Sequence, residues 1–145
     1  MLAMAAGMAG GGLLADWLCR HWGIRGGRRT MAIGGMLASS GFALLGISAE
    51  QPERVVLWFA LALAALGMCE GVFWTTVTEL GGRAGGMAAA FLNTLGNGGG
   101  ALAPWLTAVL MQRFGWHVAI GFACTVCGLG GLLWFGFDPA RSDAD

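Results

Sequence analysis

Long apolar stretches take up most of this 145-residue chain and constrain its fold more than any other feature. Each stretch has roughly 18 to 25 residues, the length that an α-helix needs to cross about 30 Å of hydrocarbon. Hydrophobic residues make up 57% of the sequence and charged residues only 11%, against about 25% charge in a soluble domain. The composition excludes a soluble domain and predicts an all-α membrane protein with about five transmembrane helices. The predicted spans are residues 1–18, 30–48, 55–80, 87–111 and 116–137, followed by a tail, 139–145.

The distribution of arginine predicts how these spans are oriented. The chain has no lysine, and its eight basic residues are balanced by eight acidic ones, which argues against a nucleic-acid partner. Basic connections stay on the cytoplasmic side of a membrane. Six arginines fall in the first and third connections and the tail, and two in the others. This asymmetry predicts a multi-pass protein of the cell (inner) membrane with a cytoplasmic C-terminus.

Glu70 lies deep inside the third predicted span. A carboxylate there costs roughly 2.5 to 3.5 kcal/mol, so such a residue normally faces a bundle interior or a water-filled path. Trp74 and Thr78 follow at steps of four and therefore share its helix face. No arginine falls within a predicted span, so two interpretations remain open for Glu70. It takes up a proton or meets a cationic group, or it stays a neutral carboxyl hydrogen-bonded to a neighbouring helix.

The fourth predicted span carries two asparagines among small residues. Asn93 and Asn97 are four residues apart, so both amides emerge on one helix face, while Gly96, Gly100 and Pro104 follow a neighbouring line. Three consecutive glycines before the proline predict a weakened, kinked helix, which is tolerated only against protein or a water-filled cavity. The asparagines either line a pathway or join helices through hydrogen bonds, and the glycines are expected to pack against another helix.

Other kinds of chemistry find little support in the sequence. Cys124 and Cys127 are spaced like a redox or metal pair, but no second pair or histidine lies near them in the sequence. His21 and His117 are predicted at opposite membrane faces, so they cannot share a metal. No nucleophile can be matched with a base. The sequence therefore predicts neither an enzyme nor a metal or cofactor site.

Several segments carry a resemblance to a known family. They are FWT at 73–75, ELGG at 79–82, AAFLNTLGNGGGALAP at 89–104, FGW at 114–116 and LWFGFDP at 133–139. Together they resemble the C-terminal half of major facilitator superfamily transporters, with the anion:cation symporters as the nearest branch. Gly12 and Asp16 resemble the start of the superfamily's cytoplasmic signature, Gly-x-x-x-Asp-Arg-x-Gly-Arg-Arg. Trp17 replaces the basic residue after the aspartate, and the Gly-Arg-Arg element comes only at 27–29.

The resemblance implies that the five spans correspond to helices eight to twelve of a twelve-helix carrier. It implies a small organic anion as substrate, such as a sugar acid or carboxylate, a proton or sodium as coupling ion, and an N-terminal half that completes the carrier. The pathway residues would be Glu70, Trp74, Asn93 and Asn97, and the cytoplasmic gate residues Gly12, Asp16, Arg28 and Arg29. The alternative is a small multi-pass membrane protein that does not transport and acts as a structural or assembly partner.

Overall fold

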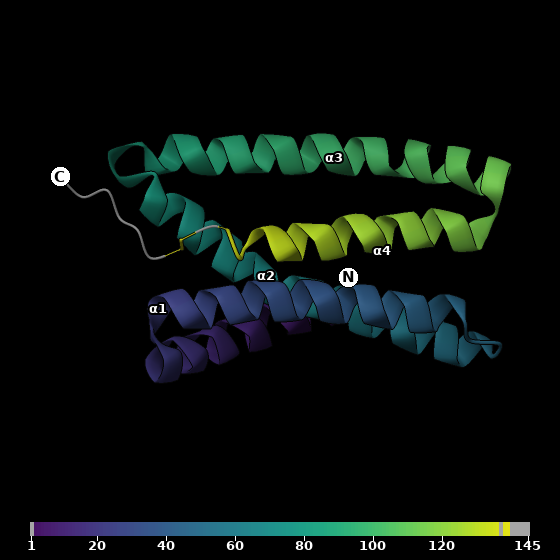
Figure 1. The fold of residues 1–145 in the computed structure, drawn as a ribbon, viewed down its shortest axis with the longest axis horizontal. Helices are drawn as coiled ribbons and strands as arrows, with labels where there is room; N and C mark the ends of the chain where they lie inside the picture. The colour runs from purple at the N-terminus through teal and green to yellow at the C-terminus, as the bar shows by residue number, and fades with distance from the viewer. Residues whose placement is uncertain (1, 137, 140–145) are drawn as a thin grey trace.

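The computed structural model describes residues 2–136 and 138–139, and within these residues every regular element is a helix (Figure 1). The elements are α1 (Leu2–Ile47), α2 (Pro52–Leu80), the short 3₁₀ helix η1 (Gly82–Ala84), α3 (Gly85–Phe114) and α4 (Trp116–Leu133). This architecture confirms the predicted all-α fold. Residues 140–145, most of the predicted tail, lie outside the described residues.

α1 is two helices joined at Gly23. This glycine has φ 75° and ψ 164°, a conformation that L side chains rarely adopt, and it reverses the chain. A first arm, 2–22, and a second arm, 24–47, lie side by side in Figure 1. Gly27 allows the close approach, because a Cβ added there would lie 2.5 Å from the backbone nitrogen of Cys19. The arms contain residues 2–18 and 30–47 of the first two predicted spans, but the expected polar connection between them is helical except at Gly23.

The first arm packs closely on α2 through small residues. A Cβ added to Gly11 would lie 2.5 Å from the Cα of Met68, and one added to Gly67 would lie 2.5 Å from the carbonyl oxygen of Met4. Gly7 faces the backbone of Ala64 in the same way. Close backbone approach over small residues is how helices associate in lipid, where no hydrophobic force drives them together. The buried cluster of Leu18, Met31 and Val72 lies where the two arms meet α2.

α3 is one continuous helix from Gly85 to Phe114, through the three glycines and Pro104. This continuity does not test the kink expected at these residues, which stays a prediction. Proline removes one backbone donor, and the remaining helical hydrogen bonds suffice to keep the helix continuous. A Cβ added to Gly96 or Gly100 would meet nothing within 4 Å, so no described helix packs against these glycines.

α1, α2 and α4 are long and apolar enough to cross a membrane, judged by length and composition. α3 is not among them, because glycines and asparagines lower the hydropathy of its middle. α4 ends at Leu133, short of the predicted limit of the fifth span, and Phe137 lies outside the described residues. The membrane limits of the spans, including 87–111 within α3, remain predictions.

Candidate functional site

A pocket of about 360 Å³ lies between α2 and α3 and contains the predicted pathway residues. We call it the α2–α3 pocket. The structure brings residues from positions 66–74 of α2 together with residues from positions 92–97 of α3. The sequences of these two segments do not by themselves show that they are neighbours. The pocket is lined by Leu66, Glu70, Phe73, Trp74, Leu92, Asn93, Gly96 and Asn97.

The two asparagines are held in a fixed relation to each other. Asn97 Nδ2 donates to the backbone oxygen of Asn93 at 2.9 Å and to Asn93 Oδ1 at 3.0 Å. These bonds use one donor group and leave the Asn93 Nδ2 and the Asn97 Oδ1 as the groups that a ligand can engage. The predicted sharing of one helix face by these two amides is therefore seen in the structure.

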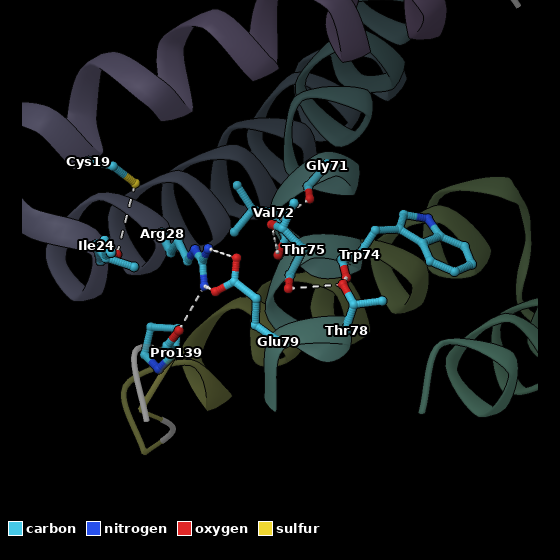
Figure 2. A network of polar contacts seen from close by, with 10 residues as sticks. All are labelled: Cys19, Ile24, Arg28, Gly71, Val72, Trp74, Thr75, Thr78, Glu79 and Pro139. Carbon is cyan, nitrogen blue, oxygen red and sulfur yellow. Dashed lines mark hydrogen bonds and ion pairs between the residues drawn. The ribbon is translucent and has the colours of Figure 1, made fainter. Parts of the chain in front are cut away.

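On the α2 side, Glu70 and Trp74 lie one turn apart and both line the pocket. Thr78, the third member of the predicted stripe, does not line it. Its hydroxyl donates to the backbone oxygens of Trp74 and Thr75 in its own helix (Figure 2). Among the described residues, none forms an ion pair with Glu70. The pocket thus offers one carboxyl, one indole N–H and two amides, which suits hydrogen bonding and the uptake of one proton or cation.

A second polar site lies where the α1 hairpin meets the end of α2. Arg28 Nη1 and Nη2 donate to the two carboxylate oxygens of Glu79, each at 2.7 Å, and Nη1 also donates to the backbone oxygen of Pro139 at 3.0 Å (Figure 2). Arg25 forms a second ion pair, with Asp138, in which Nε donates to Oδ1 at 2.7 Å. We call this set of contacts the arginine clamp. It joins the second arm to α2 and to the segment after α4.

The predicted gate residues occupy this region only in part. Gly12, Asp16 and Arg28 line a pocket of about 230 Å³ between the two arms and α2, and Arg29 follows Arg28 in the half-buried part of the second arm. Asp16 is exposed and forms no ion pair with a described residue. The acids that hold the arginines are instead Glu79 and Asp138, which sequence reasoning did not select.

One sequence signal points to these two acids. Glu79 is close to the end of the third predicted span and Asp138 follows the fifth. The topology predicted from arginine places both positions on the same membrane side as the arginine-rich first connection. Acids at span ends on the basic side are therefore candidates for pairing with its arginines.

The Arg28–Glu79 pair is expected to show energetic coupling. The Arg28 side chain is only 12% exposed while that of Glu79 is 57% exposed, so solvent screens the pair in part. A double-mutant cycle with Arg28→Gln and Glu79→Gln, measured by unfolding in mixed micelles, should give about 1 kcal/mol, since the contact is bidentate. Arg83 lies in η1 and forms no ion pair with a described residue, so the cycle of Arg83→Gln with Glu79→Gln should give almost none. Equal coupling in both cycles would contradict the clamp.

The fold and the site together define a class of protein. α2, an apolar helix of membrane-crossing length, and α3 line a pocket that holds a carboxyl, an indole and two amides and no described basic side chain, as in a multi-pass membrane protein that handles a solute. The whole chain, residues 1–145, matches the family model described as Major Facilitator Superfamily, and the chain belongs to this superfamily. Its members are transporters, so membership supports a transport role in general. Comparison with curated proteins and with solved structures gives no match.

Proposed function

We propose that this chain forms part of the substrate pathway of a secondary active carrier for a small organic anion, such as a sugar acid or carboxylate. The α2–α3 pocket is the observation that carries the proposal, because Glu70, Trp74, Asn93 and Asn97 come from two helices and line one pocket. The proposal also takes the five spans as equivalents of helices eight to twelve, with an N-terminal half that completes the carrier.

In this proposal, Glu70 couples the anion to a proton or sodium ion. An ionised Glu70 repels an anion strongly in a medium of low dielectric constant. Binding of the coupling ion neutralises the carboxyl and removes that repulsion, so the anion enters only with its ion. The Asn93 Nδ2 and the Trp74 indole N–H are donors that suit an anionic oxygen. No arginine lines the pocket, so the balancing cation belongs to the completing half of the carrier.

The arginine clamp fits the role of a cytoplasmic gate. It ties the tip of the α1 hairpin to the end of α2 and to Asp138, so opening this end of the bundle requires the Arg28–Glu79 contact to break. Gly12, Asp16, Arg28 and Arg29 belong to this gate in the proposal, and Glu79 and Arg25 join them. The gate lies on the cytoplasmic side, as does the C-terminus.

Thiol labelling tests whether the pocket is open to water. In a chain whose four cysteines are replaced by alanine, Asn93→Cys and Asn97→Cys should react with a charged, membrane-impermeant methanethiosulfonate about tenfold faster than Leu95→Cys, because a lipid-facing thiol has no access to water. Leu95 is 62% exposed, lies on the opposite face of α3 at the same depth, and lines a separate apolar pocket with Met87 and Phe91, so it is a matched control in apolar surroundings.

The same experiment separates the carrier from its alternative. The open space around Gly96 and Gly100 favours a structural partner that docks α3 onto another helix and buries Glu70 and both asparagines in fixed contacts. In that case all three introduced cysteines would be equally inert. A slow Asn93→Cys alongside a slow Leu95→Cys therefore favours the structural role and counts against the pathway.

A further inference from the structure

The outer face of the first arm carries an ordered series of side chains near the hairpin tip. Leu13, Trp17 and Arg20 are spaced by four and three residues and therefore share one helix face. All three are exposed, Leu13 at 77% and Trp17 at 51%. At 1.5 Å per residue, the indole lies about 6 Å and the guanidinium-bearing residue about 10 Å beyond the leucine along the helix. Along this face toward the hairpin tip, an apolar leucine is followed by an indole and then by a cationic side chain.

Arg20 is the uncompensated cation of this region. Arg25 and Arg28 pair with Asp138 and Glu79, whereas Arg20 forms no ion pair with any described residue. Asp16 lies one turn before Arg20, but it lines the pocket between the two arms and α2 and makes no ion pair with it. Arg20 is exposed, so its positive charge is accessible to an outside partner.

His21 adds a second hydrogen-bonding group beside Arg20. Its ring lies 4.4 Å from that of Trp17, and its Nδ1 lies 2.9 Å from the Trp17 backbone oxygen. Because a carbonyl oxygen only accepts, Nδ1–H is the donor, and in the neutral ring Nε2 is left as an acceptor for a hydroxyl of an outside partner. Trp22, 59% exposed, completes an indole-rich tip. Indoles prefer the membrane interface, and helical arms of membrane-crossing length place this tip there.

We propose that the series Leu13, Trp17 and Arg20 is a binding site for an anionic phospholipid. The acyl chain packs on Leu13, the Trp17 indole lies at the level of the glycerol, and Arg20 binds the phosphate, while His21 Nε2 accepts from a headgroup hydroxyl. A zwitterionic headgroup brings its own cation to the phosphate, while an anionic one leaves the phosphate for Arg20. The site depends on the membrane location of the chain and on neither the substrate nor the coupling ion of the proposed carrier.

Tryptophan quenching by brominated lipid tests this site in the full chain. The chain is placed in phosphatidylcholine nanodiscs that contain a small, equal fraction of either dibrominated phosphatidylglycerol or dibrominated phosphatidylcholine. The difference between the wild-type chain and Trp17→Phe isolates the signal of Trp17. We expect brominated phosphatidylglycerol to be enriched about fivefold at Trp17, the preference that one arginine near the surface confers on an anionic lipid.

Three variants decide the outcome. Arg20→Gln should remove the enrichment, and Arg20→Lys should keep most of it. Arg113→Gln is the matched control, because it removes the same charge from an exposed position at the far end of α3 and should leave the enrichment intact. Equal quenching by the two lipids, or enrichment that survives Arg20→Gln, would overturn the proposal. Loss of enrichment with inorganic phosphate, but not with chloride at equal ionic strength, would assign Arg20 to a free anion and would also overturn it.

Discussion

Replacing Gly11 by leucine is expected to destabilise the protein by about 3 kcal/mol, the upper range for overpacking a closely packed site. The added Cβ would lie 2.5 Å from the Cα of Met68, and a backbone atom cannot move aside as a flexible side chain can. The first arm would have to separate from α2, and contacts along the whole arm would weaken. The free energy of unfolding in mixed detergent micelles measures this effect.

Gly10→Leu is the matched control for this prediction. Gly10 is adjacent in the same arm, but it is exposed, and a Cβ added there would meet nothing within 4 Å. Leucine favours a helix by almost 1 kcal/mol over glycine, so this variant should be as stable as the wild-type chain or slightly more stable. If the two variants lose the same stability, the close contact between the first arm and α2 is wrong.

Gly96→Leu is expected to close the α2–α3 pocket without disturbing the helices. Gly96 lines the pocket of about 360 Å³, and its Cβ would meet no atom within 4 Å, so the leucine side chain can enter the empty space. The rate at which Asn93→Cys reacts with a charged thiol reagent should fall by about tenfold, because the side chain occupies the volume that the reagent must enter.

Gly100→Leu controls for the added bulk. Gly100 lies one turn further along α3, also has open space around it, and does not line the pocket. It should change the reaction rate of Asn93→Cys by less than about twofold, since the route into the pocket remains open. A strong effect of Gly100→Leu, or none of Gly96→Leu, would show that the reagent reaches Asn93 by a route other than this pocket.

The fold class could be predicted from the sequence because it depends on local properties. A long apolar stretch must form a helix in lipid, where each backbone polar group needs an internal partner. The pairing of Asn93 and Asn97 on one face likewise follows from helical spacing, and the structure adds the hydrogen bonds between them. Pro104 and the glycines before it are local signals for a weakened helix, whereas the hydrogen bonds of the rest of α3 keep it continuous.

The glycines show what local reasoning lacks. Gly96 and Gly100 have the small-x-x-x-small spacing expected of a packing face, yet no described helix contacts them, while Gly7 and Gly11, with the same spacing, pack on α2. The spacing makes a close approach of two helices possible, but whether it occurs depends on which helix lies opposite the glycines. The arginines are similar: Arg28 binds Glu79, 51 residues away, and nothing near Arg28 in the sequence specifies that partner.

The sequence by itself determined that this chain is helical, embedded in a membrane and related to a family of transporters, because apolar length, helical spacing and motif are properties of single segments. Only the tertiary structure decided that Glu70 and Trp74 face Asn93 and Asn97, and that Arg28 pairs with Glu79. Those facts depend on the rotation and register of one helix against another. Rotation and register are set by the packing of whole helix surfaces, which no single segment contains.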